Sequence, residues 1–156
     1  MTRTIAVLVA AVLVSIATQA MAQGERTVRI ASNYSALAGS RDNAIALVEA
    51  LRYGAPVKLA QPEPAVARRV PAMVVLEPPT GEMEWGDVDR ALAMAQDGLA
   101  RARIARPSAE QLEAALLGGD VTNDHGEALA FAGILTLHAS GVPWSEVARL
   151  AAPRAR

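Results

Sequence analysis

The stretch DVDRALAMAQDGLARAR, residues 87–103, carries the clearest helical pattern of the chain. Its apolar residues recur every three or four positions and share one helix face, while charged and amide residues take the other face. Acidic residues open the stretch and arginines close it, as the helix dipole favours, and Asp97 with Arg101 makes an i,i+4 pair of opposite charge. We expect an amphipathic helix here that turns its apolar face to a core. That face carries Val88, Ala91, Leu92, Ala95, Leu99 and Ala102.

Two further segments carry helix-boundary signals. Ser40 is an expected N-cap for a helix over residues 42–53, which Gly54 would end. Ser108 followed by Gln111 predicts a capping box at the start of another helix. Two shorter helices are expected near the C-terminus, over residues 133–139 and 144–151, on either side of the turn Gly141-Val142-Pro143.

Signals for β-strands are short and scattered. We expect a short strand over residues 27–30 and edge strands over residues 57–59 and 73–76. Residues 121–122 could pair with residues 128–130 in a small hairpin. Residues 55–80 hold six of the nine prolines, which makes a helix improbable there because proline lacks a backbone donor.

These patterns predict a mostly α fold: a small helical domain of three to four helices, with a Pro-rich segment and at most minor β-hairpin content. The expected organisation is a signal peptide over 1–22, an N-terminal segment with one helix over 23–54, a Pro-rich linker or extended segment over 55–80, and a helical core domain over 81–152.

The first residues are typical of a secretory leader. Arg3 precedes an apolar run over residues 5–17, and Ala20-Met21-Ala22 matches an A-x-A cleavage site. The run is shorter than the roughly 20 apolar residues of a membrane-spanning helix, which argues against an uncleaved anchor. We expect cleavage after Ala22, a mature protein that begins at Gln23, and a periplasmic or secreted location without stable membrane insertion.

Composition excludes several functional classes. The 156 residues contain no cysteine, so disulfide frameworks, thiolate metal sites and cysteine nucleophiles are ruled out. The formal charge of −1 gives no basic footprint for nucleic acid. Phosphate-binding loops, nucleophile elbows and dinucleotide fingerprints do not occur in the sequence. We therefore predict no catalytic residues, no cofactor and no metal ligands, and we expect a non-catalytic protein.

Two alternatives rest on particular residues. His125 and His138 with nearby acids would support a minor periplasmic hydrolase or metal-dependent enzyme, although their spacing matches no zinc motif. Residues 134–141 and 144–150 are similar to the start of a helix-turn-helix. DNA binding is disfavoured because the chain ends soon afterwards with only Arg154 and Arg156 as a basic patch.

An acidic stretch with one tryptophan is the strongest local charge feature. Its acids are Glu77, Glu82, Glu84, Asp87 and Asp89, and no Lys or Arg lies between Arg69 and Arg90. Such a stretch is either a solvated loop, a Ca²⁺ site or a surface for a basic partner, and Trp85 either folds inward or anchors a sugar or a protein. We take Trp85, Glu82, Glu84 and Asp87 as candidate partner-binding residues of an envelope protein that binds another protein or a cell-wall component.

The C-terminal half also resembles small exported proteins of unknown function of the proteobacterial type. The residues that carry this resemblance are Pro79-Thr80-Gly81, Trp85-Gly86-Asp87-Val88, Gly118-Gly119-Asp120-Val121-Thr122, Gly133-Ile134-Leu135-Thr136-Leu137 and Ala139-Ser140-Gly141. The resemblance implies export and architecture, and it implies no mechanism.

Overall fold

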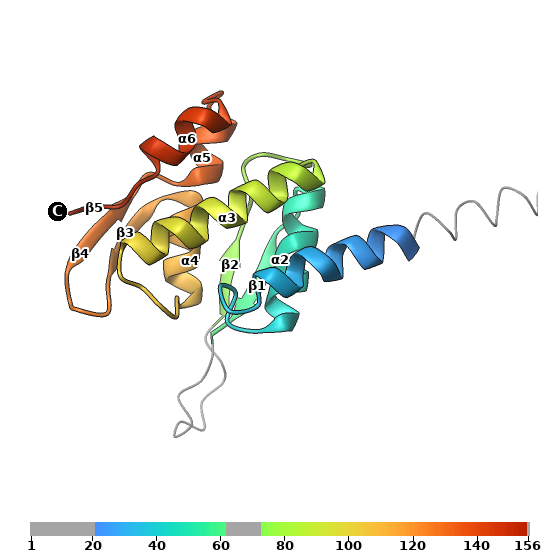
Figure 1. Ribbon diagram of the computed structural model, residues 1–156, viewed down its shortest axis with the longest axis horizontal. Helices are drawn as coiled ribbons and strands as arrows, with labels where there is room; N and C mark the ends of the chain where they lie inside the picture. Colours follow the sequence, from blue (N-terminus) through green and yellow to red (C-terminus); the bar gives the residue numbers. More distant parts are fainter. Residues whose placement is uncertain (1–20, 62–72, 156) are drawn as a thin grey trace, which may run out of the picture.

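The fold combines helices with two small antiparallel sheets. The computed structural model describes residues 21–61 and 73–155 (Figure 1). A helix over residues 21–33 comes first. It is followed by α2 (Arg41–Tyr53), β1 (Val57–Ala60), β2 (Met73–Leu76), α3 (Trp85–Arg101), α4 (Ala109–Leu117), β3 (Gly119–Thr122), β4 (Ala128–Phe131), α5 (Ile134–Ala139), α6 (Trp144–Leu150) and β5 (Arg154–Ala155).

The predicted fold class was wrong: the protein has more helices and more β-structure than the mostly α domain expected from the sequence. The described chain has six helices, with 52% of residues helical and 15% in strands, and is therefore mixed α/β rather than a bundle of three to four helices with minimal β-structure. β1 pairs with β2, with Val57 opposite Leu76, and β3, β4 and β5 form the second sheet in that order. β5 has only two residues, a length at which alternation of apolar residues leaves no readable pattern.

The expected strand over residues 27–30 was also wrong, because these residues belong to the first helix. Thr27, Ile30, Ala31 and Tyr34 are all buried, at the i, i+3, i+4, i+7 spacing of a helix face. The strands expected at 57–59 and 73–76 and the hairpin at 121–130 are confirmed. The expected leader, up to residue 20, and the part of the Pro-rich segment over 62–72 lie outside the described residues.

The local boundary signals are confirmed. Ser40 caps α2 by accepting a hydrogen bond from the Asn43 amide at 3.0 Å, and Gly54 ends the helix in the left-handed conformation. Ser108 and Gln111 form the capping box at the start of α4. The helix predicted over 87–103 begins two residues earlier than expected and ends at Arg101.

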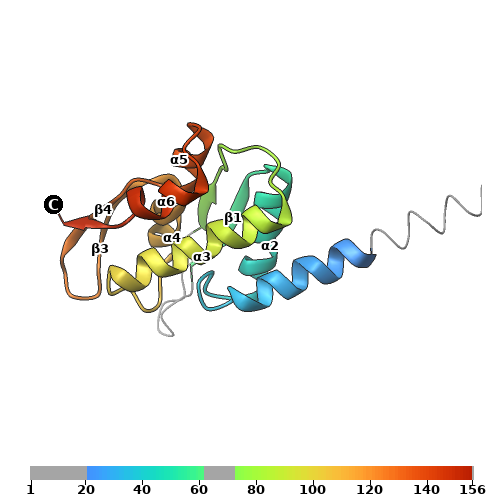
Figure 2. The same cartoon turned by 45° about the horizontal axis from the view of Figure 1, so that its top comes forward.

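The central helix of the fold is α3. Its first turns lie near α2, and its last turn approaches the β3–β4 turn (Figures 1 and 2). Buried side chains from the first helix to α6 form one cluster that consists mainly of leucine, valine and alanine, including Leu47, Leu59, Leu92 and Leu116. Within the described ranges, none of the helices has both the length and the apolar character that crossing a bilayer requires.

Asn43 joins α2 to the edge of β1. Its side-chain amide donates to the carbonyl oxygens of Ala38 and Ala60, both at 2.8 Å, and its Oδ1 accepts from the Ala60 amide at 3.2 Å. The side chain therefore satisfies both backbone groups of Ala60, as a neighbouring strand would.

Candidate functional site

The four predicted partner-binding residues lie around the start of α3. Trp85 is the first residue of the helix and is half-buried against the core. Glu84 is the N-cap residue and makes no side-chain capping bond, and Glu82 is exposed in the loop before it. The Asp87 carboxylate accepts a hydrogen bond from the Arg90 guanidinium at 2.8 Å.

Arg52, at the end of α2, holds this loop in place. Its carbonyl oxygen accepts from the Met83 amide at 3.2 Å, and its guanidinium donates to the Met83 carbonyl at 3.0 Å. The same guanidinium lies 5.5 Å from the centroid of the Trp85 ring and 5.7 Å from that of Tyr53. These distances are within the range of cation–π attraction.

A close backbone contact lies beside this arrangement. A Cβ atom added at Gly54 would come within 2.4 Å of the backbone of Gly81, and both glycines have positive φ. Tyr53 and Glu82 also form an isolated β-bridge next to this contact. The loop before α3 therefore packs directly on the end of α2, backbone against backbone.

The first helix adds arginines to the same region. Arg26, Arg29 and Asn33 lie on one face of that helix and line a hollow of about 320 Å³ together with Trp85 and Asp89. We call this hollow the Trp85 groove. Polar and charged residues share its lining with apolar surface, to which Ile30 and Trp85 belong.

Tyr34, which directly follows the first helix, connects that helix to α3 at Asp89, a residue that lines the groove. Its hydroxyl lies 2.8 Å from the Asp89 carboxylate and 3.0 Å from the Asp89 carbonyl oxygen, as a donor to both. Burial, and then the hydrogen bond to Asp89, raise the pKa of the Tyr34 phenol above its usual range. The phenol therefore remains a neutral donor, and Asp89 is partly engaged within the protein.

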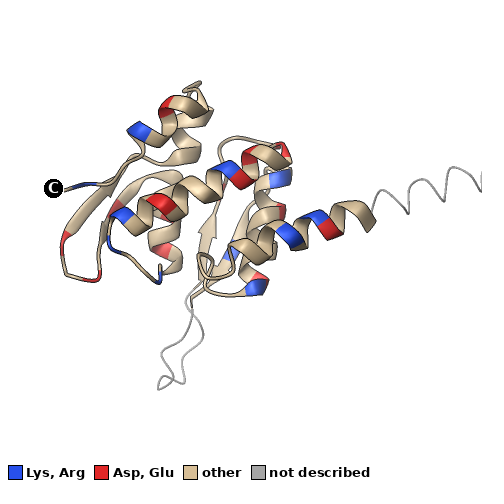
Figure 3. Cartoon of the chain, in the orientation of Figure 1, with Lys and Arg blue, Asp and Glu red and all other residues tan. Residues whose placement is uncertain are grey.

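In the folded protein, basic side chains surround the acidic stretch around Trp85. Along the chain it has no Lys or Arg before Arg90, but the fold brings Arg52 beside it and places Arg26 and Arg29 in the groove that Trp85 lines. Figure 3 accordingly shows acidic and basic segments interspersed around the start of α3. An anionic group can therefore approach Trp85 without entering a purely acidic field.

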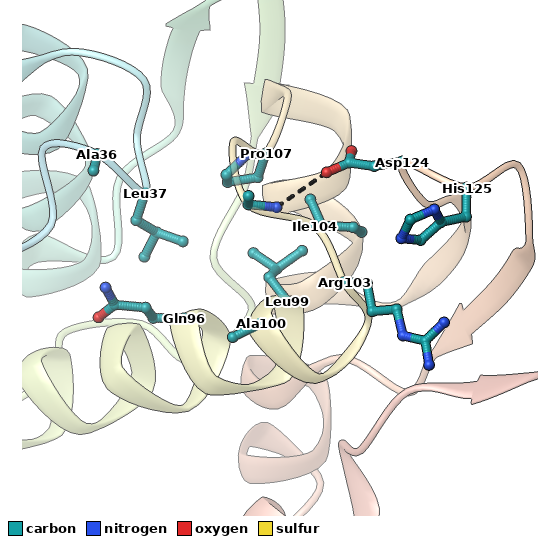
Figure 4. A pocket seen from close by; sticks show the side chains of 11 residues that line it. Ala36, Leu37, Gln96, Leu99, Ala100, Arg103, Ile104, Pro107, Asp124 and His125 are labelled. Atoms are coloured by element: carbon teal, nitrogen blue, oxygen red, sulfur yellow. Dashed lines mark hydrogen bonds between the residues drawn. The ribbon is translucent and has the colours of Figure 1, made fainter.

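A second hollow lies at the opposite end of α3 and is larger, with a volume of about 540 Å³ (Figure 4). We call it the α3 C-terminal pocket. Leu37, Leu99, Ile104 and Pro107 supply apolar lining, and Arg103 and His125 stand at its rim.

The two histidines lie in different parts of the molecule. His125 is exposed in the β3–β4 turn. His138 on α5 stacks on Trp144, with ring centroids 3.9 Å apart, and its Nδ1 lies 3.3 Å from the Val142 carbonyl oxygen. Among the residues that the structure describes, no three histidine or carboxylate side chains gather in a way that could hold a metal ion.

Sequence reasoning named Trp85 as a candidate binding residue but did not name the arginines that surround it in the fold. Arg26, Arg29 and Arg52 belong to other helices, and their approach to Trp85 depends on tertiary packing. A helical interpretation of residues 21–33 would have placed Arg26, Arg29 and Asn33 on one face. Comparisons with protein-family models, with curated proteins and with solved structures found no match to this chain.

Proposed function

We propose that this protein is an exported, non-catalytic binding module of the cell envelope, and that its Trp85 groove binds a sugar chain of the cell wall whose peptide substituents carry carboxylates. One observation carries the proposal. A half-buried tryptophan, an isoleucine, two arginines, an asparagine and an aspartate line a single small hollow that offers both apolar and charged surface.

The lining suits a sugar ring with a carboxylate on a neighbouring substituent. The flat apolar face of a pyranose can lie on an indole, whose ring offers a large apolar surface next to polar groups. Arg26 and Arg29 offer planar guanidinium forks, which bind carboxylates through paired hydrogen bonds. Asn33 can both donate to and accept from sugar hydroxyls.

The same lining suits a protein partner less well. The centre of a protein–protein interface is usually apolar and depleted in charge, with well-packed aromatic anchors. Here Arg52 already occupies the neighbourhood of the Trp85 ring, and charged residues surround the indole. A polar ligand that uses the charges is therefore the better fit.

The proposed location rests on the leader-like residues 1–22 and on the expected cleavage after Ala22. Fractionation of cells that express the chain, followed by mass spectrometry of its N-terminus, tests this part. We expect envelope or medium fractions to contain a protein that begins at Gln23. An intact Met1 on protein that stays in the cytoplasm would refute it.

Sedimentation with insoluble peptidoglycan sacculi, and with chitin as a neutral amino-sugar polymer, tests the ligand. We expect the protein to sediment with sacculi and not with chitin. The double variant Arg26→Gln/Arg29→Gln should lose this binding, whereas Arg106→Gln, which removes an exposed arginine outside the groove, should retain it. Equal sedimentation of both variants, or equal binding to chitin, would reject a carboxylate site in the groove.

Fluorescence gives a second readout because the chain has only two tryptophans. In a Trp144→Phe background, Trp85 is the sole indole emitter, so soluble peptidoglycan fragments should shift or quench its emission in a saturable manner. If sacculi bind but this signal does not change, the ligand occupies another surface and the groove assignment fails.

A further inference from the structure

The α3 C-terminal pocket offers an apolar surface that lies apart from the Trp85 groove. Leu99 and Ile104 are almost completely buried beneath it, and Leu37 approaches from the loop after the first helix (Figure 4). Alanines at positions 36, 100 and 105 line the pocket as well, and their small side chains leave its volume open. A volume of about 540 Å³ lies within the range of about 300–1,000 Å³ that is common for small-molecule sites.

The buried Asn123 side chain holds the β3–β4 turn, which contributes polar residues to the pocket, against the end of α3. Its Nδ2 donates to the Ala102 carbonyl at 3.1 Å, and its Oδ1 accepts from the amides of His125 and Glu127. The β3–β4 turn is thereby fastened to the last turn of α3. The neighbouring Asp124 carboxylate accepts from the Ala105 amide at 3.2 Å, so the acid of this rim is bound to the protein backbone.

The Arg103 guanidinium is not paired with an acid within residues 21–61 and 73–155. The two ion pairs found in the described ranges join other residues, and no hydrogen bond of the Arg103 guanidinium is found there either. Its backbone has φ +61°, the one positive φ of a described non-glycine residue, at the position where a helix normally ends with glycine. An arginine is thus held at the pocket rim in a conformation that costs backbone energy.

These features together point to a ligand with two unlike ends. The lining offers contact to an apolar body, and the rim offers an unpaired guanidinium together with the exposed His125. We propose that the α3 C-terminal pocket binds a small amphiphile, a medium-chain monocarboxylate, with its aliphatic chain over the exposed Ala36, Ala100 and Ala105 and its carboxylate at Arg103.

The test is a ¹⁵N-correlation NMR titration of the purified chain with octanoate and, separately, with octan-1-ol. We expect saturable shifts at the amides of Leu37, Leu99 and Ile104 with both ligands. Octanoate should bind about fivefold more tightly, which corresponds to one partly exposed charge-assisted hydrogen bond. The variant Arg103→Gln should remove this preference while its spectrum stays that of the folded protein.

A filling substitution tests the cavity itself. Ala100→Leu places a larger side chain in the pocket and should abolish the shifts, whereas Ala93→Leu makes the same change at an exposed position of α3 outside the pocket and should leave them intact. If Ala100→Leu does not fold, Ala36→Leu in the facing loop serves instead.

Three results would overturn the proposal: shifts that do not saturate, shifts confined to residues outside the pocket, and a preference for octanoate that survives Arg103→Gln. Binding by the Trp85 groove is measured with different ligands and different variants. The two proposals can therefore fail independently.

Discussion

Replacing Asn43 by alanine should destabilise the protein far more than its position near the start of a helix suggests. The substitution removes three hydrogen bonds and leaves the carbonyls of Ala38 and Ala60 and the amide of Ala60 without their partner. At about 1 kcal/mol for each lost bond, the cost is about 3 kcal/mol. The better helix propensity of alanine offsets about 0.5 kcal/mol of this. We expect a net loss of about 2–3 kcal/mol in the free energy of unfolding.

Urea unfolding followed by far-UV circular dichroism measures this loss. With a typical slope of about 2 kcal/mol per molar urea, the midpoint should fall by about 1 M. Glu49→Ala is the matched control, because Glu49 is an exposed residue of the same helix. It should change stability by less than about 0.5 kcal/mol. If Asn43→Ala costs no more than this control, the side chain does not join α2 to β1 as described.

Asn43→Asp separates the donor from the acceptor role of this side chain. The aspartate keeps an oxygen for the Ala60 amide but turns its other oxygen toward two carbonyl oxygens. This arrangement raises the pKa of the carboxyl in the folded state. The folded state then binds the proton more tightly than the unfolded state, so the deficit relative to the natural protein should shrink as pH falls through the raised pKa. A deficit that does not change with pH would contradict the described geometry.

Three further predictions concern single positions. Gly133→Ala should cost several kcal/mol or prevent folding, as judged by circular dichroism and urea unfolding, because the new Cβ would lie 2.3 Å from the backbone of Leu117 at a φ of +80°. Arg103→Gly should be more stable than Arg103→Ala by about 1 kcal/mol in the same assay, since only alanine retains the left-handed strain; equal stability would argue against that strain. In a spectrophotometric titration, the difference between the natural protein and Tyr34→Phe should show the Tyr34 phenol ionising above its usual range, because burial and the hydrogen bond to Asp89 raise its pKa. The stability that the natural protein has over Tyr34→Phe should be full below about pH 10 and decline above it; a Tyr34 phenol that ionises near pH 10 would contradict this.

Local signals in the sequence were sufficient for most of the helices. The caps at Ser40, Gly54 and Ser108 depend on residues within one or two turns, and each boundary that they predicted is present. The first helix was missed because residues 27–30 alone alternate like a strand, and only a longer window reveals the helical spacing through Tyr34.

The strands and the site could be predicted only in part, because both depend on contacts between distant segments. The described strands have at most four residues, too few for periodicity to distinguish them from coil, and β5 is defined only by its pairing with β4. Trp85 was named as a candidate from the sequence, but its neighbours Arg29 and Arg52 come from other helices. The charge environment of Trp85 therefore follows from the tertiary fold and cannot be read along the chain.

The contact between Gly54 and Gly81 has a consequence for binding. Because backbone meets backbone there, the distance between the end of α2 and the loop before α3 is set without any side chain that could change rotamer. Trp85, which lines the groove, follows this contact in the loop before α3, so its position is pre-organised and the binding proposed for the groove should cost little conformational entropy there. A side chain at position 54 should consequently weaken the proposed binding, although this position does not line the groove.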